Sequence, residues 1–152
     1  MFEPILFDTN ILVYAHNFDS ALHHYALDKV KDVAEGRLKG VLAQQNLLEF
    51  YSIVTDHKRV ANPLSPKEAK ELIKDYLNSP FEIIFPTKET SEILLSLCQE
   101  NNIKNGEIFD IYLAATCVSN KIRTILTANI TDFKNLTVLK VIDLNSELEK
   151  SY

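Results

Sequence analysis

Near the N-terminus, residues 4–15 read Pro4-Ile5-Leu6-Phe7-Asp8-Thr9-Asn10-Ile11-Leu12-Val13-Tyr14-Ala15. An apolar run typical of a buried strand ends at Asp8, Thr9 and Asn10, and apolar residues then return at helical spacing. This order places the Asp8 carboxylate at the carboxyl end of a strand, where ligands and catalytic groups gather in open α/β sheets. Asp8 could simply cap the helix, but Thr9 and Asn10 are also competent caps. The surplus of polar groups favours a site at Asp8.

The rest of the chain alternates short apolar strands with helices. Strands are predicted at residues 5–8, 40–43, 81–85, 123–127 and 138–142. Helices are predicted at residues 10–15, 19–36, 45–57, 65–78, 87–102 and 110–120, with Gly36 and Thr87 as caps and a capping box at Ser65-Pro66-Lys67-Glu68. Polar loops are predicted at residues 58–64, 101–107 and 128–135. This alternation predicts a three-layer α/β/α fold with a parallel sheet of about five short strands.

The length and composition indicate one globular domain that spans residues 1–152. The chain is long enough to bury a core without the help of disulfides or structural metals, and it contains no internal repeat or linker. No apolar run approaches the roughly 20 residues that cross a bilayer, and no basic N-terminal leader is present. We therefore expect a cytoplasmic protein, in which Cys98 and Cys117 are buried thiols rather than a disulfide.

The charge balance restricts how this protein could bind nucleic acid. The chain has 16 Lys and Arg against 21 Asp and Glu, a net charge of −5. Proteins that bind nucleic acid by neutralising phosphates alone are usually basic. A nucleic-acid substrate would therefore need bound cations or a local basic group, such as His57-Lys58-Arg59. The remaining histidines, His16, His23 and His24, are expected at the surface.

Three further acidic residues follow strands or open a helix. Asp132 follows the predicted fourth strand together with Thr127 and Asn129, Glu49 lies in the helix after the second strand, and Asp110 opens a helix. Each has an ordinary structural explanation, as a turn, a surface residue or a favourable first-turn charge. Together they converge with Asp8 on the same edge of a parallel sheet.

A cluster of four carboxylates predicts a bound cation. Carboxylates about 4 Å apart repel by several kcal/mol at an effective dielectric of 20, so a proton or a cation must intervene. Oxygen donors without His or Cys favour Mg²⁺ or Mn²⁺ over Zn²⁺. Such ions suit phosphoryl chemistry. Phosphate-binding glycine loops, paired-cysteine metal motifs and nucleophile elbows are absent from the sequence.

These segments resemble the PIN-domain ribonucleases, in particular the small VapC-like toxins of toxin–antitoxin pairs. The resemblance rests on residues 7–15, on Glu49, on Phe109-Asp110-Ile111-Tyr112-Leu113-Ala114-Ala115 and on Leu126-Thr127-Ala128-Asn129-Ile130-Thr131-Asp132-Phe133. It implies a metal-dependent endoribonuclease that uses Mg²⁺ or Mn²⁺ while water attacks the scissile phosphate in line.

Carried over to this chain, the resemblance assigns roles to single residues. Asp8 and Asp110 match the principal metal-binding aspartates, Glu49 the acid that completes the pocket, and Thr127 a supporting hydroxyl. The family often has an aspartate two residues after this threonine, where this chain has Asn129. We expect Asp132 to supply that charge, which gives Asp8, Glu49, Asp110 and Asp132 as catalytic and metal-binding residues, supported by Thr9, Asn10, Thr127 and Asn129.

The resemblance also implies partners, and it leaves alternatives open. VapC-like toxins commonly form homodimers and bind a cognate antitoxin; helices 65–78 and 87–102 are candidate dimer surfaces by analogy. Asn129 keeps open a catalytically weak PIN-like module that binds RNA or protein. A haloacid-dehalogenase-like phosphatase is less favoured, because it calls for Asp-x-Asp after the first strand and Asn10 occupies the second position.

Overall fold

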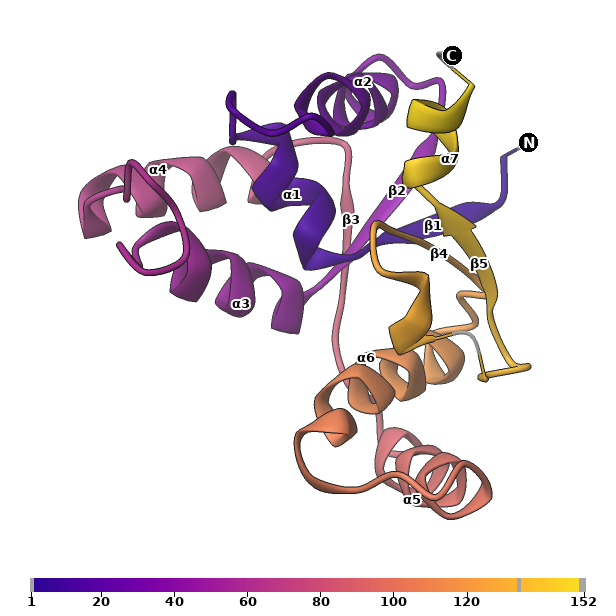
Figure 1. Ribbon diagram of the computed structural model, residues 1–152. Helices are drawn as coiled ribbons and strands as arrows, with labels where there is room; N and C mark the ends of the chain where they lie inside the picture. Colours follow the sequence, from indigo (N-terminus) through magenta and orange to yellow (C-terminus); the bar gives the residue numbers. More distant parts are fainter. Residues whose placement is uncertain (1, 134, 151–152) are drawn as a thin grey trace.

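A five-stranded parallel sheet runs through the centre of the computed structural model, which describes residues 2–133 and 135–150 (Figure 1). The strands are β1 (Pro4–Phe7), β2 (Lys39–Ala43), β3 (Glu82–Ile84), β4 (Thr124–Thr127) and β5 (Lys140–Asp143), in the spatial order β3-β2-β1-β4-β5. Each neighbouring pair is parallel. The chain first winds from β1 towards β3 and then returns to β4 on the other side of β1. The β1–β4 boundary is therefore the topological switch point, the usual place for a ligand.

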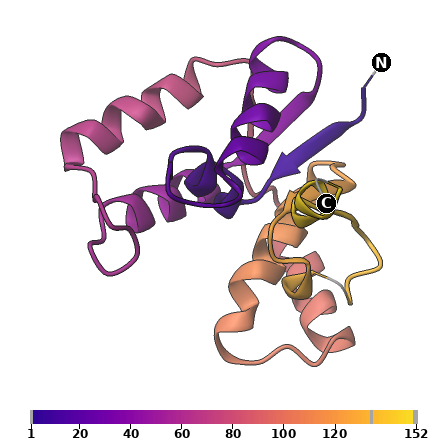
Figure 2. The ribbon, with the colours of Figure 1, turned by 45° about the horizontal axis from the view of Figure 1, so that its top comes forward.

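Helices cover both faces of the sheet (Figures 1 and 2). They are α1 (Thr9–Ala15), α2 (His23–Ala34), α3 (Gln44–Val54), α4 (Pro66–Leu77), α5 (Thr90–Glu100), α6 (Ile108–Ser119) and α7 (Asn145–Glu149), with 3₁₀ turns η1 (Asn105–Glu107) and η2 (Ile130–Asp132). Helices α1 to α4 and α7 cover one face, and α5 and α6 cover the other. The predicted three-layer α/β/α fold is confirmed.

Adjacent residues of β1 serve the two opposite cores. Phe7 is fully buried among residues of α1, α3 and α4, including Leu12 and Phe50. Leu6 is fully buried in the second core, beside Ile125 of β4 and residues of α6. Because side chains alternate across a strand, a strand covered on both faces must be apolar at successive positions. This requirement explains the continuous apolar run before Asp8.

Three predicted helix signals are confirmed. Asp8 is the N-cap of α1. Ser65 and Glu68 form the reciprocal capping box of α4, with Pro66 as its first residue. Gly36 follows the end of α2 with a φ of +74°, a backbone conformation that glycine adopts without steric cost.

Two predicted helices are shorter than expected. The helix predicted from residue 19 begins at His23, because the Ser20 hydroxyl accepts the Leu22 N–H and holds the preceding residues in a turn. The helix predicted to reach residue 57 ends at Val54, and the Asp56 carboxylate accepts the Lys58 N–H in the turn that follows.

Other boundaries also differ from the prediction. Helix α5 begins at Thr90, so Thr87 does not cap it. The Thr87 hydroxyl instead accepts the Glu89 N–H in the turn before the helix. Helix α6 begins two residues before Asp110, and β5 lies slightly later than predicted. Helix α7 was not predicted. Residue 134, in the third predicted loop, lies outside the described residues.

Three surface expectations can be compared with the structure. Cys98 and Cys117 are free thiols, as predicted, and Cys117 is buried; the expected burial was wrong for Cys98, which is partly exposed. No helix in the described ranges is both long and apolar enough to cross a membrane. The prediction for His16 was wrong: its ring is partly buried, with Nε2 2.8 Å from the Tyr76 hydroxyl, and burial lowers its pKa. His16 therefore links α1 to α4.

Candidate active site

Asp8 lies at the carboxyl end of β1, directly at the switch point of the sheet. Its Oδ1 accepts the Thr9 N–H at 2.8 Å, while Oδ2 accepts the Thr127 hydroxyl at 2.8 Å and Asn10 Nδ2 at 3.3 Å. The side chain is only 8% exposed. Capping a helix needs a single accepted N–H. The additional contacts of Oδ2 therefore fix the direction of the second carboxylate oxygen.

Thr127 is the last residue of β4 and joins this strand to the Asp8 site. Besides donating to Asp8, its Oγ1 accepts Asn10 Nδ2 at 3.2 Å and the Asn129 N–H at 3.0 Å. Asn10 Oδ1 in turn accepts the Ala128 N–H at 3.1 Å. A hydroxyl offers one donor and two acceptor lone pairs, so Thr127 uses its full capacity.

Asn129 and Asp132 occupy the loop after β4. Asn129 Nδ2 donates to Asp132 Oδ2 at 2.9 Å, and Asn129 Oδ1 accepts the Thr131 hydroxyl at 2.6 Å. Both ends of the Asn129 amide are thus engaged within the loop. In this arrangement Asn129 orients Asp132, which carries the negative charge.

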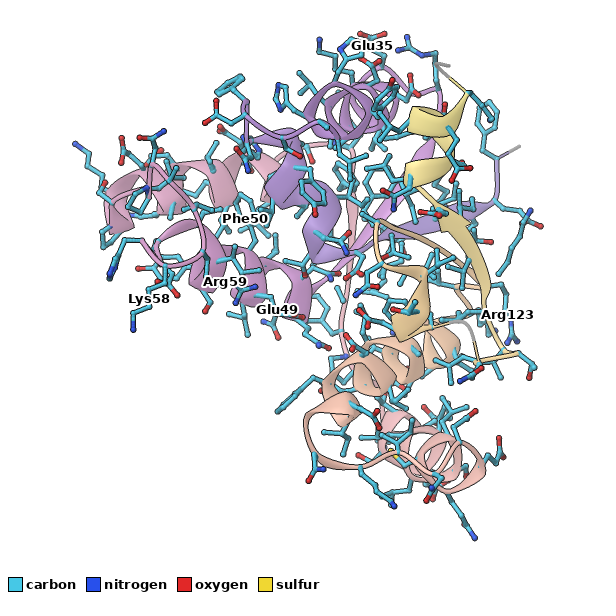
Figure 3. All side chains as sticks on the ribbon, in the orientation of Figure 1. Glu35, Glu49, Phe50, Lys58, Arg59 and Arg123 are labelled. Atoms are coloured by element: carbon cyan, nitrogen blue, oxygen red, sulfur yellow. The ribbon has the colours of Figure 1, made fainter. Side chains whose placement is uncertain are left out.

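Glu49 is half-buried on α3, the helix that follows β2. Figure 3 shows it on the side of α3 towards α6, whereas Phe50 points between α3 and α4. Burial raises the pKa of Glu49, the charge of Asp8 raises it further, and the Gln45 amide lowers it. Glu49 therefore lies within electrostatic range of Asp8.

Asn46, on the same helix, supports the site through hydrogen bonds that could not be predicted from the sequence. It is fully buried; its Oδ1 accepts the Ala43 N–H at 2.8 Å and its Nδ2 donates to Thr9 Oγ1 at 3.1 Å. The first bond caps α3, and the second ties α3 to the residue next to Asp8. In the sequence, the only signal was an asparagine close to the start of the predicted helix.

Asp110 lies in the first turn of α6, as predicted from the sequence. Burial raises its pKa to about 7, with further contributions from the negative charges of Asp132, Asp8 and Glu49. The three other predicted acids thus all act electrostatically on Asp110.

The pKa values of Asp8 and Asp132 are also raised. Burial raises the pKa of Asp8 and so does the charge of Asp132, whereas the bonds from Thr127 and Thr9 lower it. Burial also raises the pKa of Asp132. Groups that raise one another's pKa are stabilised in the ionised form by a nearby positive charge.

A cavity of about 140 Å³ opens beside Asp110 and Asp132. Its wall includes Asn101 from the end of α5, Glu107 from η1 and Thr131 from η2. Polar and apolar side chains line this cavity, and through it solutes can reach the two carboxylates from the side of α5 and α6. This cavity is the accessible part of the site.

The donor set fits a hard divalent cation. All four predicted ligands offer carboxylate oxygens, the donors that Mg²⁺ and Mn²⁺ prefer. Within residues 2–133 and 135–150, no three acidic, histidine or cysteine side chains form a ready-made metal cage. Mg²⁺ does not require one, because it is usually held by one or two carboxylates and keeps several waters.

The fold and the site together define a class of protein. This is a parallel α/β protein with a buried aspartate at the switch point, and further acids on α3, α6 and the β4 exit whose pKa values burial raises. The PIN domain family model matches residues 5–139. The chain belongs to the PIN-domain family, and the resemblance predicted from its motifs is confirmed.

Known proteins similar to this chain include a ribonuclease and toxin–antitoxin complexes. Ribonuclease VapC24 of Mycobacterium tuberculosis is 26% identical over 136 residues, which cover 90% of this chain and 93% of the relative. A toxin–antitoxin complex from Klebsiella pneumoniae contains a chain with 21% identity and a TM-score of 0.61, covering 92% and 97% of the two chains. VapBC2 from Rickettsia felis, bound to a DNA fragment from the promoter, gives 21% identity, a TM-score of 0.64 and coverage of 92% and 98%. At these identities the two structures support the fold alone.

Proposed function

We propose that this chain is a metal-dependent endoribonuclease that acts as the toxin of a toxin–antitoxin pair. The observation that carries the proposal is the hydrogen-bonded group of Asp8, Thr127 and Asn10 at the switch point, together with the cavity that Asp110 and Asp132 share. Burial and the charges of the other acids raise the pKa of Asp110 to about 7. The similarity to Ribonuclease VapC24 supports RNA as the substrate class. The carboxylate site supports hydrolysis of a phosphodiester bond.

Each residue of the site has a defined task in this proposal. Asp8, Glu49, Asp110 and Asp132 would hold Mg²⁺ or Mn²⁺. Thr127 and the Thr9 N–H favour the ionised form of Asp8, against the effect of its burial. Asn10 fixes the distance between the start of α1 and the β4 exit, and Asn129 aims Asp132.

A bound divalent cation supplies Lewis acidity towards the scissile phosphate and activates the attacking water. It would also bring positive charge to a chain whose net charge is −5. Away from the carboxylates, Lys58 and Arg59 follow the outer end of α3 and offer contacts to distal phosphates (Figure 3).

An antitoxin is the proposed protein partner, because several structural neighbours are toxin–antitoxin complexes. The proposed compartment is the cytoplasm, where free thiols such as Cys98 and Cys117 remain reduced.

We propose a homodimer as the assembly. Leu48 and Phe109 are 67% and 64% exposed near the site, and Leu95 on α5 is 66% exposed. Apolar side chains of this size at a surface often mark a contact between chains. Light scattering during gel filtration tests this: a dimer mass is expected, and a monomer at all concentrations would contradict it.

The direct test of the proposed activity is RNA cleavage by highly purified protein, with and without Mn²⁺. Wild-type protein should cleave only with the metal, and Asp110→Asn should cleave far more slowly while keeping its circular dichroism spectrum. Asp75→Asn, on the surface of α4, is the matched control and should cleave like wild type.

Asn129 supports a second candidate function, a catalytically weak PIN-like module that binds RNA or protein. Its side-chain amide is neutral and therefore adds no charge to the site, and it is hydrogen-bonded to Thr131 and Asp132. Absence of both Mn²⁺ binding and metal-stimulated cleavage in wild-type protein would favour this module over the enzyme.

A further inference from the structure

The backbone that leaves β4 is held on both sides of the residue that follows Thr127. On one side, the Ala128 N–H donates to Asn10 Oδ1 at 3.1 Å. On the other side, the Ala128 carbonyl accepts Nδ2 of Asn145 at 2.8 Å. This single peptide segment is therefore clamped between the start of α1 and the start of α7. The same segment leads into the loop that carries Asn129 and Asp132.

Asn145 is itself held in place by Asp143, the last residue of β5. Asp143 Oδ1 accepts both the backbone N–H and the side-chain Nδ2 of Asn145, each at 2.9 Å. In addition, the Leu144 N–H donates to the Thr127 carbonyl at 2.9 Å. The C-terminal segment thus contacts the β4 exit through a backbone bond and a side-chain bond in succession.

The hydrogen bonds of Asn145 do not serve to cap helix α7. Helix α7 has five residues, and the Asn145 amide makes no capping bond to it. The amide instead points back to Ala128, 17 positions earlier in the sequence. Asn145 also lies beyond residues 5–139, the part of the chain that the PIN domain family model matches. The family match therefore assigns it no role.

We propose that Asn145 is a positioning residue that fixes the β4 exit and thereby the direction of Asp132 towards Asp8 and Asp110. This inference rests on the proposed function, because it concerns the same carboxylate site. Asn145 touches neither substrate nor metal. It acts through the Ala128 carbonyl, on a segment that Asn10 of α1 and Thr127 of β4 also hold.

The test compares Asn145→Ala with Asn120→Ala. Asn120 is the matched control, since its Nδ2 also donates to a loop carbonyl, that of Phe85 at 2.7 Å, at the other end of α6 from Asp110. The first measurement is amide hydrogen exchange of Asn129 in the metal-free proteins, because this N–H donates to Thr127 Oγ1. The second is Mn²⁺ affinity by calorimetry on the protein alone, and the third is kcat and KM for RNA cleavage.

We expect Asn145→Ala to accelerate exchange at Asn129, to weaken Mn²⁺ binding by about tenfold and to lower kcat by about tenfold, as for residues that orient metal ligands. KM should change less than kcat. Asn120→Ala should leave all three unchanged. Asp143→Asn should also resemble wild type, since its Oδ1 still accepts both bonds from Asn145.

Wild-type exchange at Asn129 and wild-type Mn²⁺ affinity in Asn145→Ala would overturn the inference. If wild-type protein neither binds Mn²⁺ nor cleaves RNA, the proposed function fails, and the exchange measurement alone decides whether Asn145 holds the loop. Unfolding of Asn145→Ala is detected by its circular dichroism. In that case Asn145→Leu, which keeps the size of the side chain but removes the donor to the Ala128 carbonyl, replaces it, and wild-type exchange at Asn129 in that variant would also overturn the inference.

Discussion

The Thr127 hydroxyl donates a 2.8 Å hydrogen bond to the buried carboxylate of Asp8 and so joins two residues that are 119 positions apart. Burial raises the pKa of Asp8, and this bond is the largest of the influences that lower it. The contact crosses the switch point of the sheet between β1 and β4. Thr127 therefore acts on both the position and the protonation of Asp8.

Removal of this hydroxyl should impair the site while leaving the fold intact. In Thr127→Val the methyl groups keep the volume, but Asp8 loses the bond that favours its ionised form, so its pKa rises further. We expect RNA cleavage to fall by about 10- to 100-fold, with the acid limb of the pH–rate profile displaced to higher pH.

Thr127→Ser is the control for this prediction, because it keeps the hydroxyl and should retain most activity. An unchanged acid limb in Thr127→Val would show that the hydroxyl has no influence on an ionisation required for cleavage.

The raised pKa of Asp110 predicts how stability depends on pH. Its pKa in the folded protein is about 7, against 3.8 for the unperturbed group, so between these values the folded state binds the proton more tightly. The contribution of Asp110 to stability is therefore lost as the pH rises from about 4 to about 7.

Asp110→Asn should stabilise the metal-free protein at pH 8, by about 1 kcal/mol once solvent screening of this half-buried group is allowed for. Urea unfolding at pH 8 and pH 4 measures the effect, and the gain should vanish at pH 4. A variant equally stabilised at both pH values would show that charge is not the cause.

Metal binding should stabilise the wild-type protein. At a Mn²⁺ concentration 100 times its dissociation constant, a ligand specific for the folded state adds about 2.7 kcal/mol. Thermal unfolding with Mn²⁺ and with EDTA should differ accordingly at pH 7.5. The difference should shrink at pH 5, where protons compete for the carboxylates whose pKa values are raised, Asp8, Glu49, Asp110 and Asp132.

Much of this arrangement could be predicted from local sequence. The apolar run before Asp8 predicted a strand buried on both faces, and the capping box at Ser65 predicted the start of α4. The four acids were expected together because parallel strands place their carboxyl ends at one edge of the sheet. The charges of Asp132, Asp8 and Glu49 raise the pKa of Asp110, and the grouping of the four acids into one metal site stays a prediction.

The parts that could not be predicted depend on distant partners. Asn46 and Asn145 look like ordinary polar residues in the sequence, and their roles depend on Thr9 and on Ala128, which only the folded chain brings near. His16 was expected at the surface because its neighbour in space, Tyr76, lies 60 positions away. Helix α7 has five residues, too short for a periodic pattern.

The contact between Asn46 and Thr9 should contribute to stability and to the site. A double-mutant cycle with Asn46→Ala and Thr9→Val isolates this contact, because the single change at Thr9 leaves the cap bond to Ala43 in place. We expect a coupling free energy of unfolding of about 0.5–3 kcal/mol. Additive effects would mean that the two side chains act independently.

The most direct measurement is Mn²⁺-dependent RNA cleavage by wild-type protein and by Asp8→Asn, purified in parallel and shown to be folded. Asn at position 8 keeps the size and a carbonyl oxygen but removes the charge at the centre of the site. Cleavage should require Mn²⁺ in the wild type, and the variant should lose at least about 10³-fold, more than 4 kcal/mol of transition-state stabilisation. Undiminished cleavage by Asp8→Asn would contradict a catalytic metal site built on Asp8.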